Sequence, residues 1–124
     1  MDYIAHVKRL YRAANLSNFA VADWAPLAEL ITVDDFEWVS HNREVLNWEE
    51  YIQYLTQWAR SMTWESTVHR IHQWQNVVFL EHDERYTFDD RVNAVRSITV
   101  FEFNPAGKIQ RVAVYLQQEP SLGL

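Results

Sequence analysis

The sequence predicts an α+β fold, in which a cone-shaped, curved and mainly antiparallel sheet packs on three helices. Three observations predict it: helical spacing of apolar residues in the first half, a change to alternation after Thr63, and turn residues between the alternating stretches. The expected order is helix, helix, strand, helix and then four strands. A length of 124 residues suits one domain, which we place at 1–118, with a C-terminal tail at 119–124.

The first part of the chain carries two helical patterns and one short strand pattern. Apolar side chains recur at spacings of three and four over residues 3–15, which predicts an amphipathic helix. A short second helix is expected after Asp23, which can cap it, with Pro26 in its first turn. Residues 36–40 then alternate, so they predict a short strand.

A third helix is expected to run from Asn47 to about Met62. Asn47 and Glu50 have the spacing of a capping box, in which each side chain accepts a hydrogen bond from the other's backbone N–H. The apolar stripe begins at Trp48 and follows helical spacing to Met62.

The second half of the chain has the alternation of strands. Four such stretches predict four strands, at 66–75, 77–88, 91–104 and 108–118. The turns between them are short, and Gly107 is free to take a positive φ in the last one. Neighbouring strands joined by such turns must be antiparallel. Because long strands in such sheets curl, the sheet and its helices are expected to enclose an interior pocket.

Composition excludes several classes of function. With no cysteine, the chain has no disulfide, no thiol nucleophile and no cysteine-ligated zinc or iron–sulfur centre. Two glycines are too few for a P-loop or a dinucleotide-binding fingerprint, so no cofactor is expected. A net charge of −6 argues against a nucleic-acid partner. The sequence shows neither a membrane-spanning stretch nor a signal peptide, and a cytoplasmic location is expected.

Three stretches, 27–38, 77–85 and 100–116, carry a likeness to a known family. The last is the clearest, with a strand, an Asn-Pro-Ala-Gly-Lys turn and a second strand. Together they resemble the nuclear transport factor two-like superfamily, also called SnoaL-like or ketosteroid isomerase-like, over about residues 3–118. The resemblance implies a curved sheet wrapped around helices, no required cofactor, and a homodimer. The superfamily includes isomerases, cyclases, hydrolases, dehydratases and noncatalytic binding proteins, so the fold alone does not fix the function.

Ketosteroid isomerases of this superfamily use residues that the chain replaces in part. Their general-base aspartate corresponds to Ser40, and their neutral hydrogen-bonding aspartate falls near Thr99. Their tyrosine on the first helix corresponds to Tyr11 or Leu10. A serine cannot abstract a carbon-bound proton without a base of its own, so the steroid-type isomerase reaction is not expected.

Limonene epoxide hydrolase-like members use an Asp–Arg–Asp set to activate water. The positions of its arginine and one aspartate fall near His82 and Glu84, and that of its last aspartate falls near Val114. The chain departs from the set at all three places, so the resemblance does not carry that substrate over.

His82 and Glu84 are the candidate catalytic pair. In a strand over 77–88, alternate residues that include both share the less charged face, which we assign to the interior. Side chains two apart on one face are close enough to interact, and a carboxylate is expected to raise the pKa of the histidine. The alternative is a solvated pair at the rim of the strand.

The same alternation predicts an apolar interior with few polar groups. Its expected lining is Tyr11, Trp38, Ser40, Trp58, Leu80, Thr99, Phe101, Val112, Val114 and Leu116. Such a lining favours a small apolar or aromatic molecule as the ligand, unless the side chains meet and leave no cavity. Three hypotheses follow. The chain is a pocket protein with or without catalysis; or a cyclase, isomerase or hydrolase with His82 as acid–base and Glu84 orienting it; or a dimeric interaction module.

Two further patterns concern the other face of the sheet. His69 and His72 would share a side on a helix, but on the strand predicted here they are expected on opposite faces, so no metal site is predicted. Phe79 and Tyr115 occupy alternate strand positions that are expected to face outward, and charged residues surround them there. This arrangement suits a homodimer interface with a polar rim.

Overall fold

The computed structural model describes residues 2–13 and 24–117. Its elements are α1 (Tyr3–Ala13), α3 (Ala25–Ala28), β1 (Glu37–Val39), β2 (Val45–Leu46), α4 (Trp48–Ser61), β3 (Thr63–Trp74), β4 (Val77–Phe88), β5 (Arg91–Phe103) and β6 (Ile109–Gln117). This order confirms the predicted α+β class. The predicted link after the first helix, the capping residue Asp23 and the tail at 119–124 lie outside the described residues.

The strands form one open six-stranded sheet in the order β2-β1-β6-β5-β4-β3. As predicted, β3 to β6 are an antiparallel meander. Two features were not predicted: the strand β2, and the parallel pairing of β1 with β6, in which Trp38 lies opposite Val112. The parallel pair makes the sheet mixed, and it joins the short N-terminal strands to the edge of the meander.

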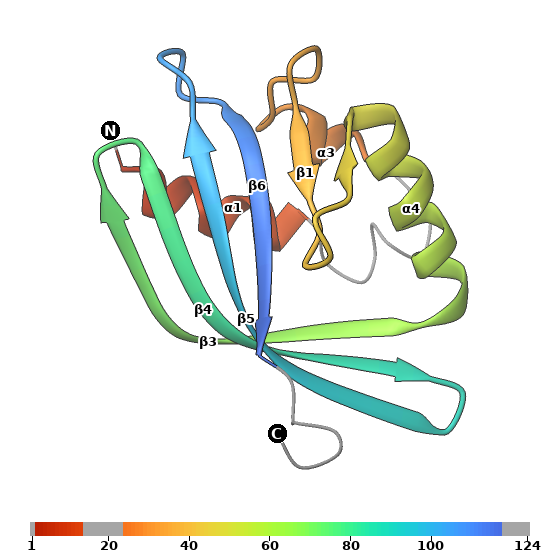
Figure 1. Ribbon diagram of the computed structural model, residues 1–124. Helices are drawn as coiled ribbons and strands as arrows, with labels where there is room; N and C mark the ends of the chain where they lie inside the picture. The colour runs from red at the N-terminus through yellow and green to blue at the C-terminus, as the bar shows by residue number, and fades with distance from the viewer. Residues whose placement is uncertain (1, 14–23, 118–124) are drawn as a thin grey trace.

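The sheet is strongly bent, and the helices lie on its concave side (Figure 1). The register shifts between Val68 and Arg70 in β3 and between Glu102 and Phe103 in β5, as at β-bulges, which bend a strand and increase its twist. Helix α1 packs on β3 and β4, whereas α4 packs on β1 and β2. None of the described helices is long and apolar enough to cross a membrane.

Local signals in the sequence account for where α4 and the turns lie. The capping box is present: the Asn47 side chain accepts a hydrogen bond from the Glu50 N–H at 2.9 Å, and Glu50 accepts one from the Asn47 N–H at 3.0 Å. Asp89 and Gly107 take positive φ values of 52° and 79° in the predicted turns. The N-cap position of α3 is held by Trp24, whose side chain makes no capping hydrogen bond.

The core lies between α1 and the concave face of the sheet. The β4 residues on this face are buried, from Val78 to Glu84 at alternate positions, whereas Phe79 on the other face is exposed. The predicted interior and exterior faces of β4 are therefore confirmed. The largest fully buried side chain is Phe101 of β5, which packs in one cluster with Val7 of α1 and Phe36.

Candidate functional site

A cavity of about 520 Å³ lies between the helices and the concave face of the sheet. Its lining comes from helices α1, α3 and α4 and from strands β1, β3, β4, β5 and β6. Nine of the residues that were predicted to face the interior line this cavity: Tyr11, Trp38, Trp58, Glu84, Thr99, Phe101, Val112, Val114 and Leu116. The fold thus brings most of the predicted lining to one space.

Three predicted site residues do not line the cavity: Leu80, Ser40 and His82. Leu80 is buried in the core cluster, which also contains Val7 of α1. Ser40 directly follows β1, and its hydroxyl accepts a hydrogen bond from the Glu44 N–H at 3.1 Å while bonding to Asn42. Ser40 therefore stabilises the turn between β1 and β2 instead of facing a ligand.

Aromatic rings form a continuous belt along one side of the cavity. In order the rings are Tyr51, Trp38, Tyr54, Trp58 and Tyr86, and successive centroids lie 5.2, 5.3, 4.8 and 5.1 Å apart. All five line the cavity. We call them the aromatic belt. It joins β1, α4 and β4 across the space that the sheet and helices enclose.

The Glu84 carboxylate is the buried acidic group of the cavity lining, with the residue only 8% exposed. One oxygen accepts a hydrogen bond from the Trp64 indole N–H at 2.9 Å. The other accepts one from the Ser97 hydroxyl. Since both donors are neutral, they orient the carboxylate but do not neutralise it.

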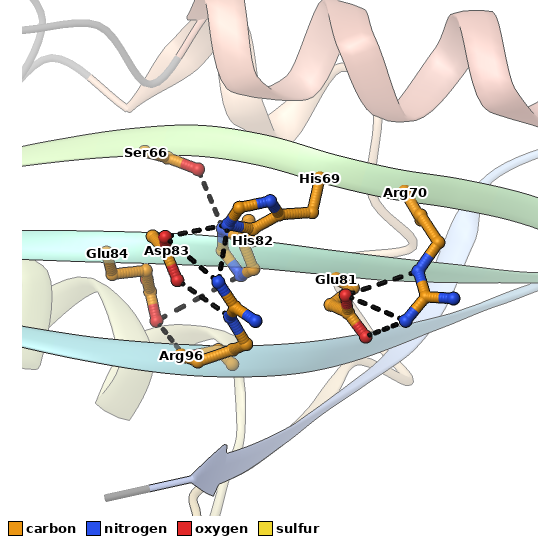
Figure 2. A network of polar contacts seen from close by, with 9 residues as sticks. Ser66, His69, Arg70, Glu81, His82, Asp83, Glu84 and Arg96 are labelled. Carbon is orange, nitrogen blue, oxygen red and sulfur yellow. Dashed lines mark hydrogen bonds and ion pairs between the residues drawn. The ribbon is translucent and has the colours of Figure 1, made fainter.

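His82 lies directly behind this carboxylate and is fully buried (Figure 2). Its Nδ1 is 2.7 Å from the Ser66 hydroxyl, and its Nε2 is 3.1 Å from the Thr99 hydroxyl. The Nε2 atom is also 4.0 Å from a Glu84 oxygen. Burial lowers the pKa of His82, and this effect exceeds the opposite effects of Glu84 and Asp83. The predicted rise in its pKa is therefore wrong, because the sequence pattern does not reveal complete burial.

Four tyrosines of the lining are held as neutral phenols. Burial is the largest cause in each case, and it raises the pKa of Tyr54 to about 12. It raises the pKa of Tyr11 and Tyr51 as well, and the charge of Glu84 acts in the same direction on all three. Burial, the charge of Glu84 and a hydrogen bond to that carboxylate raise the pKa of Tyr86. These groups can donate hydrogen bonds to a ligand but cannot supply a negative charge near neutral pH.

The outer face of the sheet carries a separate polar network (Figure 2). Asp83 accepts hydrogen bonds from Arg96 at 2.9 Å and bonds to His69 at 2.7 Å, and these partners, Arg96 first, lower its pKa to about 2. The register shift in β3 puts His69 on this face, and His72 lies there opposite the exposed Phe79. The prediction that the two histidines lie on opposite faces is therefore wrong, because a bulge reverses the alternation.

The sequence reasoning missed several aromatic residues of the lining. Tyr86 lies on the predicted interior face of its strand but is not among the predicted lining residues, and Tyr54 follows Tyr51 at a helical spacing of three. Trp64 precedes the predicted start of the first long strand, whereas β3 begins at Thr63. Extending that strand by three residues would have placed Trp64 on the same face as Ser66.

Comparison with known proteins gives matches at the level of structure. No family model matches the chain, and no curated protein matches it in sequence. An NTF2-like protein of unknown function from Burkholderia pseudomallei superposes with a TM-score of 0.76 at 12% identity, covering 94% of this chain and 92% of that one. The chain has the nuclear transport factor two-like fold.

Two other structures share the NTF2-like fold and have names that include an activity. An LEH-like epoxide hydrolase of M. tuberculosis matches with a TM-score of 0.73 at 16% identity, covering 93% of this chain and 82% of that one. A candidate SnoaL-like polyketide cyclase from Jannaschia matches with a TM-score of 0.73 at 14% identity, covering 90% and 85%. At these identities the likeness shows the fold, which confirms both the architecture predicted from the residue pattern and the resemblance.

Proposed function

We propose that this chain binds a small apolar or aromatic molecule in the cavity. The observation that carries the proposal is the cavity itself, about 520 Å³ in volume and lined by the aromatic belt with few polar groups. Pockets for small organic ligands commonly have volumes of about 300–1,000 Å³ and predominantly apolar walls. The similar structures named as an epoxide hydrolase and a polyketide cyclase also suit a fold that handles small organic molecules.

Filling the cavity should abolish binding without disturbing the sheet. Val114 of β6 lines the cavity, so Val114→Phe places a ring where the ligand would lie. We expect this variant to bind tert-butylbenzene at least about tenfold more weakly than the wild type, since it excludes the ligand from its space. Quenching of tryptophan fluorescence is a suitable readout, because Trp38, Trp58 and Trp64 line the cavity.

The matched control is Val45→Phe, which makes the same substitution at an exposed position on β2 outside the cavity lining. It should bind tert-butylbenzene as the wild type does. Equal affinities in Val114→Phe, Val45→Phe and the wild type would place the binding elsewhere and contradict the proposal.

A second candidate function is catalysis in the same cavity, of the cyclase, isomerase or hydrolase type. The observation that favours it is the buried Glu84 carboxylate, which reaches the cavity with His82 4.0 Å behind it. Since His82 does not line the cavity, Glu84 would exchange the proton with the ligand, and His82 would position the Glu84 carboxylate. These roles are the reverse of those predicted from the sequence, in which His82 was the acid–base and Glu84 oriented it. Recovering the bound ligand and comparing its NMR spectrum and its mass with those of the compound supplied distinguishes the two functions, because binding alone returns the same compound, whereas an isomer or a cyclised product differs in its spectrum even where its mass is the same.

We also propose that the chain forms a homodimer through the outer face of the sheet. Phe79 and Ile98 are 41% exposed there and Tyr115 is 59% exposed, and Ile98 lies directly opposite Tyr115 in the β5–β6 pair. Arg70 and Glu81 form an ion pair beside them. An apolar centre with charges of both signs around it suits pairing with a second copy.

Introducing a charge at the centre of this face should separate the dimer. We expect sedimentation velocity to give a dimer for the wild type and a monomer for Ile98→Lys, since pairing would remove the charge of the lysine from water at the apolar centre of the interface. Val45→Lys, at an exposed position on β2, should stay dimeric. A wild type that sediments as a monomer would rule out this assembly.

A further inference from the structure

The charge of Glu84 lacks a cationic partner among the described residues. The basic group within 4.0 Å of its carboxylate is the His82 ring, at 4.0 Å. Burial lowers the pKa of that ring, so it is neutral at physiological pH. The Trp64 and Ser97 donors are uncharged. A buried carboxylate is unfavourable unless a cation or a metal compensates it. The cavity that Glu84 lines therefore has room for the missing positive charge.

The walls around this carboxylate are those that an organic cation prefers. Tyr11 and Trp64 stack with centroids 5.7 Å apart, and Trp64 is itself bonded to Glu84. Tyr86, at one end of the aromatic belt, hydrogen bonds to the same carboxylate. The faces of such rings carry partial negative charge and attract ammonium groups, most strongly where water is excluded.

The other side chains of the lining that can carry a positive charge do not exclude a positively charged ligand. Arg91 and His41 also line the cavity, but both are exposed, at the β4–β5 hairpin and in the β1–β2 turn. Solvent therefore screens them, whereas Glu84 is buried. The net charge of −6 adds a long-range attraction for cations.

We propose that the ligand of this cavity is an organic cation, in which a protonated or quaternary amine is attached to an apolar or aromatic body. Its positive charge lies beside the Glu84 carboxylate and its body lies against the aromatic belt. This inference rests on the proposed function, since it names the class of ligand for the same cavity.

A pair of isosteric probes tests the charge separately from the shape. Phenyltrimethylammonium and tert-butylbenzene have the same shape and differ by one positive charge. We expect the wild type to bind the cation at least about tenfold more tightly than the neutral probe, by quenching of tryptophan fluorescence. Glu84→Gln keeps the size of the side chain and one accepting oxygen but removes its charge, so it should bind the two probes with equal affinity.

The control variant is Glu81→Gln, which removes the same charge from the outer face of the same strand, where Glu81 pairs with Arg70. It should retain the preference for the cation. Equal binding of both probes to the wild type, or a preference that survives in Glu84→Gln, would overturn the inference and leave the proposed function standing. Binding of neither probe would overturn both.

Discussion

Replacing Phe101 with alanine is expected to lower the free energy of unfolding by about 3–5 kcal/mol. Phe101 is 1% exposed and is the largest of the fully buried side chains. It packs in the core cluster with Phe36 and Leu80, and the ring of Tyr11 meets it edge-on at 6.1 Å. Removing the ring loses its transfer free energy and leaves a void beside an existing cavity, which the rigid sheet cannot fill. Urea denaturation measures the change.

Phe88→Ala is the matched control for this prediction. Phe88 ends β4 and is 45% exposed, so the same truncation should lower the free energy of unfolding by only about 1 kcal/mol or less. Equal losses in the two variants would mean that Phe101 does not lie in the core, and the arrangement of α1 over the sheet would have to be revised.

The stability of the protein is expected to fall as the pH drops below about 6.5. Burial lowers the pKa of His82 in the folded state, so the unfolded chain takes up a proton that the folded chain does not. The stabilisation from neutral His82 is thus present above the unfolded pKa and is lost as the pH falls. One such group contributes up to about 1.4 kcal/mol per pH unit. His6, whose pKa is lowered first by burial and then by Arg9, acts in the same direction.

His82→Gln isolates the contribution of His82 to this pH dependence. Glutamine offers a donor and an acceptor to the Ser66 and Thr99 hydroxyls, which His82 now contacts. Between about pH 7 and about pH 5, we expect the free energy of unfolding of the variant to fall less steeply than that of the wild type, by up to about 1.4 kcal/mol per unit. The range stops above the acidic region in which Asp83, with a pKa of about 2, loses its own stabilising charge. Parallel curves for the two proteins would contradict a neutral, buried His82.

The elements with a strong local signal could be predicted from the sequence. Asn47 and Glu50 specify the start of α4 through a capping box, and Gly107 marks a turn because it readily takes a positive φ. The faces of β4 followed from alternation, since no register shift interrupts its pairing with β5. The same regularity put Glu84 in the interior and Phe79 on the outside.

The features that depend on contacts between residues far apart in the sequence could not be predicted. Strand β2 has two residues, Val45 and Leu46, which is too short for a periodic pattern, and its position follows from pairing with β1. The bulge after Val68 moved His69 to the outer face, and no residue type there signals it. Leu80 and His82 share a face with Glu84, yet only Glu84 reaches the cavity, because α1 and the core cover the positions before it.

The central claim is that the cavity on the concave side of the sheet is a ligand site, and NMR titration with phenyltrimethylammonium and tert-butylbenzene tests it most directly. We expect changes in backbone amide shifts at Thr99, Phe101 and Val112, which line the cavity. The amides of Phe79 and Ile98, whose side chains lie on the outer face, should change less. Shift changes centred on the outer face, or none with either probe, would contradict the claim.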